Sequence, residues 1–150
     1  MNDRLEQAVA LLKEEQASCV IWIDGKEPIL SQEIGIKPLM KELRKEQFAF
    51  EHGVIADKVV GKAAALMAIL GGAEAVYGQV MSENAENMLK KYGIAYAYEQ
   101  KVPYIENRTK TGQCPLEEAV NSVDNPKEAF EVLEETITGL MRKNFQRIEK

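Results

Sequence analysis

The spacing of hydrophobic residues along the first half of the chain alternates between a helical and a strand-like period, and this divides it into elements. Apolar residues recur at helical spacing over residues 3–16 in a charged background, which predicts an amphipathic helix. Residues 18–23 and 28–30 are strand-like and flank Asp24-Gly25, a dipeptide that favours a tight turn, so we expect an antiparallel hairpin. Lys37-Pro38 then begins a short helix, because proline is tolerated in a first helical turn.

Strands and helices alternate in the middle of the chain. The predicted strands are residues 51–56, 75–81 and 94–98. The helix expected between the first two begins at Asp57 and ends at Gly71-Gly72, since glycine readily adopts the left-handed conformation of a helix C-terminus. That helix is apolar on nearly all sides, so we expect it to be buried. A second connecting helix, capped by Ser82, runs to Tyr92-Gly93.

In the last third of the chain the sequence pattern predicts mostly helix. Pro103 confines residues 102–106 to a sheet edge or to the start of a strand, and a polar loop follows at residues 107–112. Two helices, each opened by a proline, are expected at residues 115–122 and 126–145, and the second is amphipathic. No linker or internal repeat divides the sequence, so we predict a single domain over residues 1–150.

This order of elements predicts an α/β fold. Strands joined by helices run parallel, whereas the hairpin is antiparallel, so we expect a three-layer α/β/α sandwich around a mixed five-stranded sheet. In such sheets ligands bind beyond the carboxyl ends of the strands, near the N-termini of the helices that follow. The two corners of this kind are residues 57–62 and 82–86, and we expect a ligand site there.

Composition and charge narrow the classes of function. No apolar run reaches the roughly 18–20 residues that a membrane span requires, and the first residues have no secretory signal pattern, so we expect a soluble cytoplasmic protein. A net charge of −5 disfavours binding of a nucleic acid polymer, although a few local lysines suffice for one nucleotide. Cys19 and Cys114 lie far apart and are expected to be free thiols, Cys19 in the core.

The first corner gathers the polar residues that are candidates for binding. We expect Asp57 to cap the helix by accepting from amides two or three residues on; alternatively it is a general base or a ligand acceptor. Lys58 and Lys62, four apart, would share a helix surface and clamp a phosphate or carboxylate, or else be solvated or paired with glutamate. Gly61 would allow close approach of a ligand or of backbone, or simply pack.

Further candidates lie at the second corner and in the polar loop. Ser82 and Glu83 begin the second connecting helix and are predicted ligand-binding positions. Asn107 and Arg108 follow a possible strand, and the guanidinium of Arg108 can bind an anion in a bidentate manner. The alternative is that both are ordinary turn residues.

Cys114 is the best candidate nucleophile in the sequence. It precedes Pro115 at a predicted helix start, a position that favours the thiolate. Glu117 and Glu118 fall in the same helical turn and oppose the negative charge, so an ordinary cap-region or buried cysteine is the alternative. His52, the only histidine, is expected to be a surface or partly packed residue and is assigned no role.

The layout of a helix, a hairpin and two strand-helix corners resembles the cytidine deaminase fold. In zinc deaminases the first corner supplies His or Cys and a glutamate, and the second supplies Cys-x-x-Cys. Here the corners read Asp57-Lys58-Val59 and Ser82-Glu83-Asn84-Ala85-Glu86, and neither contains histidine or cysteine. Because zinc requires about three such ligands, no metal or other cofactor is expected.

Two pairs of stretches resemble an uncharacterised prokaryotic family, domain of unknown function 1893 (DUF1893). They are Gly35–Leu39 with Ala56–Ala65, and Val102–Arg108 with Thr111–Glu118. The resemblance spans about residues 3–122. It implies the deaminase-like fold without its metal ligands, and two distinctive segments that face a shared pocket. No activity comes with it.

Three hypotheses of function follow. The preferred one is a metal-free protein that binds an anionic small molecule, either a nucleotide or a phosphorylated metabolite. The second is an enzyme with Cys114 as nucleophile and Asp57 in proton transfer. The third is a homo-oligomeric scaffold or regulatory subunit whose final amphipathic helix pairs between subunits, and we expect a homodimer.

Overall fold

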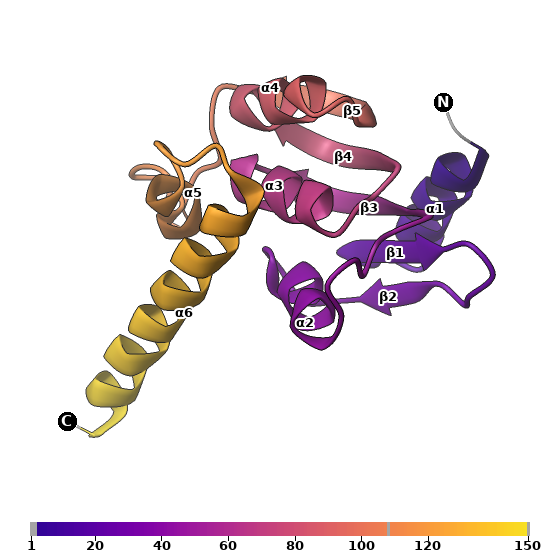
Figure 1. Ribbon diagram of the computed structural model, residues 1–150. Coiled ribbons are helices and arrows are strands. Elements are labelled where there is room, and N and C mark those ends of the chain that lie inside the picture. The colour runs from indigo at the N-terminus through magenta and orange to yellow at the C-terminus, as the bar shows by residue number, and fades with distance from the viewer. Residues whose placement is uncertain (1–2, 108, 150) are drawn as a thin grey trace.

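A mixed sheet is built from β1 (Cys19–Ile23), β2 (Ile29–Ser31), β3 (Gly53–Val60), β4 (Ala75–Ser82) and β5 (Ala95–Val102). The strand order is β2-β1-β3-β4-β5; β1 is antiparallel to both its neighbours, whereas β3, β4 and β5 are parallel. The computed structural model in Figure 1 describes residues 3–107 and 109–149, with side chains in the last helix described as far as Lys143. The predicted mixed five-stranded sheet is confirmed.

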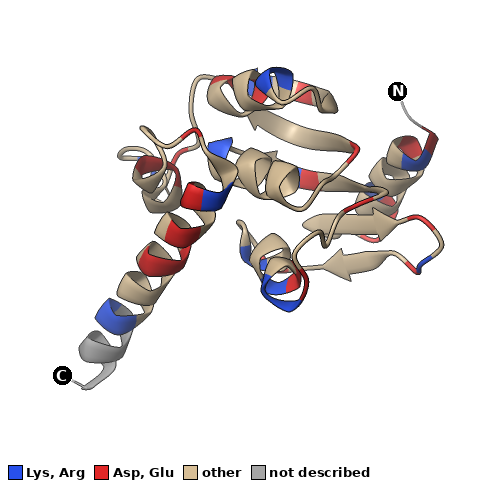
Figure 2. Cartoon of the chain, in the orientation of Figure 1, with Lys and Arg blue, Asp and Glu red and all other residues tan. Residues whose placement is uncertain are grey.

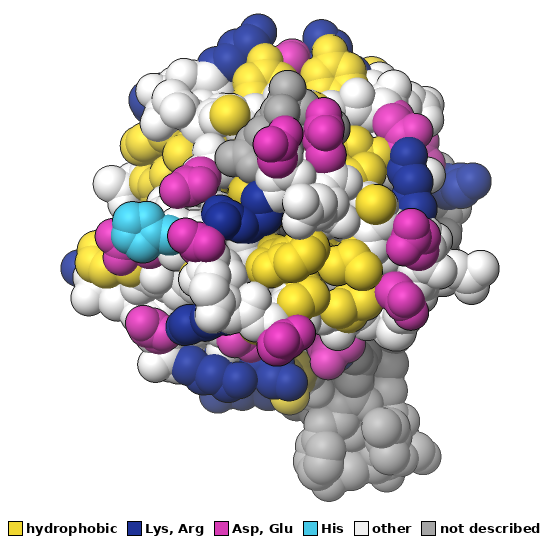
Figure 3. Space-filling view, turned by 90° about the vertical axis from the view of Figure 1, so that its right-hand side faces the viewer, with side chains coloured by type: hydrophobic (Ala, Val, Ile, Leu, Met, Phe, Trp, Pro, Cys, Tyr) yellow, Lys and Arg dark blue, Asp and Glu magenta, His cyan; other side chains and the backbone are white. Residues whose placement is uncertain are grey.

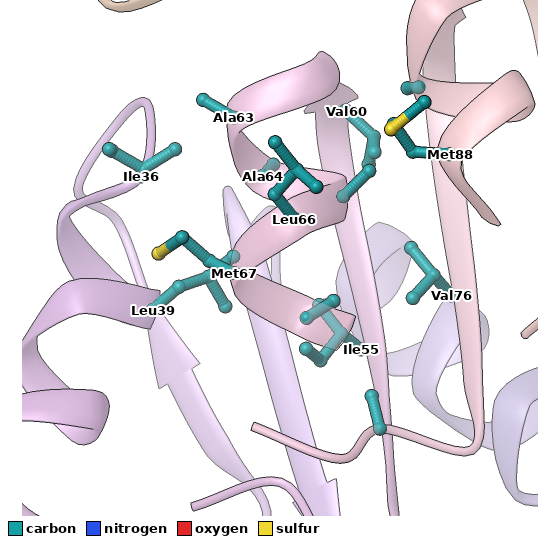
Figure 4. Packing of buried hydrophobic residues seen from close by; sticks show 14 of the residues in the cluster. Ile36, Leu39, Ile55, Val60, Ala63, Ala64, Leu66, Met67, Val76 and Met88 are labelled. Atoms are coloured by element: carbon teal, nitrogen blue, oxygen red, sulfur yellow. The ribbon is translucent and has the colours of Figure 1, made fainter. Parts of the chain in front are cut away.

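Helices cover both faces of this sheet. They are α1 (Asp3–Glu14), α2 (Lys37–Lys45), α3 (Lys62–Leu70), α4 (Glu83–Lys91), α5 (Pro115–Ala119) and α6 (Pro126–Glu149). Leu5 and Leu12 of α1 are buried in a cluster on one face. On the other face Leu39 of α2 and Leu66 of α3 pack with Ile55 of β3 in a larger cluster, shown in Figure 4. The arrangement is therefore an α/β fold with one helical layer on each side.

α3 lies at the centre of the larger cluster. All its residues from Lys62 to Ala68 are buried, as expected for a helix that is apolar on nearly all sides. The chain leaves the helix through Gly72, whose φ of 82° is the left-handed conformation that glycine adopts at low cost. The sequence signals at both the core and the end of this helix are thus confirmed.

The start of α3 differs from the prediction. β3 continues to Val60, with Val59 and Val60 paired to Val80 and Met81 of β4, and Gly61 occupies the N-cap position. Asp57 is therefore a strand residue opposite Cys19, and its predicted role as the helix cap is wrong. The strand persists because β-branched valines suit a sheet better than a first helical turn.

The C-terminal third also departs from the predicted bounds. β5 is a long edge strand, and among the described residues between Val102 and α5 a bridge between Glu106 and Gln113 is the one strand-like pairing. α5 is shorter than predicted and α6 longer, and Figure 1 shows α6 projecting away from the sheet and its helices. In the described part of the chain, none of the helices combines the length and apolar character that crossing a bilayer requires.

Candidate functional site

The carboxyl ends of β3 and β4 lie at one edge of the sheet, where α3 and α4 begin. α5 packs beside α3 at this edge, although Glu117 of α5 lies 55 residues after Lys62 of α3 in the sequence. The two segments that the family resemblance singled out, one around Gly61 and the other around Cys114, are therefore neighbours. The contacts between them define the candidate site.

The first amides of α3 hold a carboxylate that comes from α5. The backbone amide of Lys62 donates to Oε1 of Glu117 at 2.7 Å, and that of Ala63 donates to Oε2 at 2.8 Å. Burial raises the pKa of Glu117, while the two amide hydrogen bonds oppose this rise. No side-chain cap is available from Gly61, so the buried Glu117 carboxylate caps the helix instead.

Gly61 makes this contact possible. An ideal Cβ at position 61 would lie 2.2 Å from Oε1 of Glu117, well inside any real contact. The backbone of Gly61 is extended, with φ of −97°, so the glycine is not required by its conformation. Glycine is required at position 61 because the Glu117 carboxylate fills the space that a side chain would need.

Lys62 makes a structural ion pair. Its ammonium lies 2.7 Å from Oδ1 of Asp124 and donates to the carbonyl of Asn121 at 3.1 Å. Lys58 lies in β3 and is exposed, so the expectation that Lys58 and Lys62 share a helix surface is wrong. Lys58 is an exposed residue of β3, whereas Lys62 begins α3 and is buried against Asp124, so the predicted two-lysine clamp does not form.

The ion pair at Lys62 is expected to respond unequally to removal of either partner. Asp124→Asn leaves a buried ammonium with one carbonyl acceptor and should lower the free energy of unfolding by more than Lys62→Met does. Lys62→Met removes the buried charge and returns Asp124 to solvent, so a loss of only about 1 kcal/mol is expected. Urea unfolding of both variants measures this. A larger loss in Lys62→Met than in Asp124→Asn would contradict the assignment of the buried charge.

Asp57 is a buried carboxyl in the sheet. Its Oδ1 accepts from the amide of Val59 at 3.3 Å, and among the described residues Oδ2 has no hydrogen-bond partner. Burial raises its pKa to about 7, against the opposing effect of hydrogen bonds from Val59, Cys19 and Lys58. The Cys19 thiol is buried as predicted, and burial together with Asp57 raises its pKa.

At the second corner Ser82 caps α4 as predicted. Its Oγ accepts from the amide of Ala85 at 3.1 Å, and Glu83 begins the helix with an exposed side chain. Glu86, one turn further, accepts from the Tyr96 hydroxyl at 2.8 Å and from Lys101 at 3.3 Å. The hydrogen bond from Tyr96 is the largest cause that lowers the pKa of Glu86. This network was missed from the sequence.

The remaining predicted residues lie in the polar loop and at the start of α5. Cys114 is half-buried at the N-cap of α5, and its carbonyl accepts from Glu118. Asn107 ties its own loop together: Oδ1 accepts from the amide of Thr111 at 3.0 Å and from the hydroxyl of Thr109. Arg108 lies outside the described residues.

Few other features in the described part of the chain are candidates for binding a metal ion or a ligand. Among the side chains that the structure describes, as far as Lys143, no group of three or more His, Cys, Asp or Glu is arranged to hold a metal ion. His52 is exposed on the surface between Glu51 and Glu74, where Figure 3 shows it among acidic side chains. A cavity of about 350 Å³ lies between β2 and α2, lined in part by Ser31 and Lys41; none of its lining residues belongs to the two corners, residues 57–62 and 82–86.

Glu117 is the central residue that reasoning from the sequence missed. Capping rules consider acceptors within one turn of a helix start, so the sequence indicates only an effect of Glu117 on Cys114. The signals that point to it are Gly61, which leaves the first turn of the apolar helix without a cap, and a pair of glutamates in the second family segment. These two signals point to a cap from elsewhere in the chain, but they do not identify Glu117 as the residue that contacts α3.

Comparisons with known proteins agree with this fold. The profile of the family described as Domain of unknown function (DUF1893) matches residues 7–137. A DUF1893 family protein from Thermotoga maritima has a crystal structure similar to this chain, with a TM-score of 0.81 and 24% sequence identity over 90% of each chain. No curated protein matches the sequence. The chain thus belongs to the DUF1893 family.

Proposed function

We propose that this protein binds an anionic small molecule without a metal ion, and that the carboxylate or phosphate of the ligand takes the place of Glu117 at the start of α3. The observation that carries the proposal is the pair of amide hydrogen bonds from Lys62 and Ala63 to one carboxylate. A helix N-terminus whose N-cap residue has no side chain is a suitable receptor for a carboxylate or phosphate, and here Glu117 occupies it.

The energetics of Glu117 support an exchange of this kind. A buried carboxylate loses its hydration, and burial raises the pKa of Glu117 despite its two hydrogen bonds. An anion that brings more acceptor oxygens and further contacts can offset the loss of Glu117 from the site.

We further propose that the fold is of the cytidine deaminase type, with the catalytic metal site replaced by this receptor. The order of helix, hairpin and two strand-helix corners supports the assignment. The corner that begins with Asp57 carries no set of metal ligands. The first amides of α3 donate hydrogen bonds to the Glu117 carboxylate instead. Binding, rather than metal-assisted hydrolysis, is the chemistry that these groups provide.

The alternative of an enzyme that uses Cys114 as nucleophile stays a hypothesis. Its predicted proton-transfer partner is Asp57. The contacts of Asp57 are with Cys19 and with the amides of its own strand, so the geometry supports the receptor more directly.

Ligand binding is expected to raise the melting temperature of the wild-type protein. Binding to the native state alone adds about 2.7 kcal/mol of stability at a ligand concentration of about 100 times Kd. The measurement is a thermal melt with nucleotides, sugar phosphates and small dicarboxylates, each against a chloride control of equal ionic strength. An unchanged melting temperature across the whole panel would remove the support for a receptor.

Two variants separate binding at α3 from binding elsewhere. Glu117→Gln keeps one oxygen acceptor but weakens the competing occupant, so a ligand that displaces residue 117 should bind it more tightly than it binds wild type. Gly61→Ala places a methyl group in the receptor and should abolish the shift. A ligand that stabilises Gly61→Ala as much as wild type binds at another place.

A further inference from the structure

The charged groups around the Glu117 carboxylate have a negative balance. Burial has the largest effect on the pKa of Glu117 and raises it, whereas attraction to the Lys62 ammonium is among the effects that lower it. That ammonium is buried and lies 2.7 Å from Oδ1 of Asp124, whose carboxylate neutralises it. Lys62, Asp124 and Glu117 together carry one positive and two negative charges, so this group has no positive charge to balance a second negative charge on a ligand.

The surrounding elements add to the negative balance. Residues 115–130, which form α5, the turn after it and the first turns of α6, contain four acidic residues and one lysine. Figure 2 shows acidic residues on α5 and at the start of α6, and both helices pack on α3. The partial positive charge of a helix N-terminus is roughly half an elementary charge, which favours a monoanion but does not balance a buried dianion.

The space at the start of α3 fits a flat group. Oε1, Cδ and Oε2 of Glu117 lie 2.2, 2.4 and 2.7 Å from the position of a Cβ at Gly61, so the carboxylate lies against the glycine backbone. Each oxygen has its own amide donor, from Lys62 and from Ala63. A ligand carboxylate keeps this contact and both hydrogen bonds, whereas a tetrahedral phosphoryl group is thicker and lies less closely against Gly61.

We propose that the site at the start of α3 selects a singly charged carboxylate over a phosphate dianion, and that Asp124 is the residue that sets this selectivity. The inference rests on the function proposed above and narrows the ligand to a small carboxylic acid. Asp124 holds the Lys62 ammonium, so a second negative charge on the ligand would be buried beside an ion pair that is already neutral. Phosphate monoesters are mainly dianions above their second pKa of about 6, so the site disfavours them at neutral pH.

Two small anions on the wild-type protein test the selectivity. Butyrate and methyl phosphate are titrated into isotope-labelled protein at a pH of about 7.5 and equal ionic strength, and the amide resonances of Lys62 and Ala63 are followed. Butyrate is expected to bind at least about 10-fold more tightly. Gly61→Ala is the matched control and should remove the response to both anions. Methyl phosphate that binds as tightly as butyrate would overturn the selectivity alone, whereas no response to either anion would overturn the receptor as well.

Asp124→Asn tests the residue assigned to the selectivity. The variant frees the charge of Lys62, so methyl phosphate should gain at least about 5-fold more affinity than butyrate gains. Glu118→Gln, at an exposed glutamate next to Glu117, is the matched control and should keep the wild-type preference. An unchanged preference in Asp124→Asn, or an equal change in Glu118→Gln, would show that Asp124 does not set it.

Lys62→Met tests the same charge balance in the opposite direction. This variant is expected to be the more stable of the two ion-pair variants, and it leaves Asp124 ionised without its partner. The preference for butyrate over methyl phosphate should therefore widen rather than narrow. A narrower preference in Lys62→Met would overturn the assignment even if Asp124→Asn does not fold.

Discussion

Replacing Glu117 with alanine is expected to lower the free energy of unfolding by about 3–5 kcal/mol, the largest effect of any single side chain at the site. The variant removes two charge-assisted hydrogen bonds and leaves the amides of Lys62 and Ala63 without their acceptor in a buried place. It also takes away the negative charge that stabilises the positive end of the α3 dipole. Urea unfolding followed by circular dichroism measures the loss.

The contact between Glu117 and Gly61 adds a test by double-mutant cycle. Gly61→Ala alone should be nearly as destabilising as Glu117→Ala, because the new Cβ displaces the carboxylate. In the Glu117→Ala background the same change should cost little, so the two effects are far from additive. Gly139→Ala is the control: nothing lies within 4 Å of its Cβ, and the helix should gain up to about 1 kcal/mol. Additive losses would show that the glycine serves another purpose.

Asp57→Asn is expected to change the pH dependence of stability. The pKa of Asp57 is raised in the folded protein to about 7 from an ordinary 3.8, so the folded state binds the more protons between these values. Stability contributed by the protonated carboxyl is fully present below pH 3.8 and is lost as pH rises through about 7. The total loss is up to roughly 4 kcal/mol, and the asparagine variant should not show it.

Thermal melts of wild type and Asp57→Asn at several pH values between about 5 and 8 test this prediction. This range lies below the pH values at which thiols ionise. Wild type should become less stable relative to Asp57→Asn at each higher pH value, and the variant should be the more stable protein at the highest pH. Glu27→Gln, at an exposed carboxylate, is the matched control and should follow the wild-type profile. Parallel profiles for wild type and Asp57→Asn would mean that Asp57 is ionised and well solvated in the folded protein.

The fold could be predicted from the sequence because each element has a signal within its own residues. The apolar residues of α3 predicted its burial, Gly71-Gly72 predicted its end, and Ser82 predicted the start of α4; all three are confirmed. The error at Asp57 came from two local rules in conflict. Aspartate favours a helix cap, but the valines that follow it favour a strand, and pairing with β4 decided the outcome.

The candidate site was harder to predict because its main contacts join distant parts of the chain. Glu117 is 55 residues from Lys62, and Lys101 is 15 from Glu86. No periodicity or spacing rule links such pairs, since only the packing of α5 on α3 and of α4 on β5 brings them together. Reasoning from the sequence found the right corners of the sheet and missed the partners that occupy them.

The cap on α3 has a consequence for biosynthesis. A growing polypeptide that has not yet reached residue 117 holds every strand of the sheet but lacks the group that completes its central helix. Until the later segment emerges and docks, two amide groups at the heart of the nascent domain remain open to solvent or to any passing anion. Final consolidation of the interior therefore waits until α5 has been synthesised and has docked on α3.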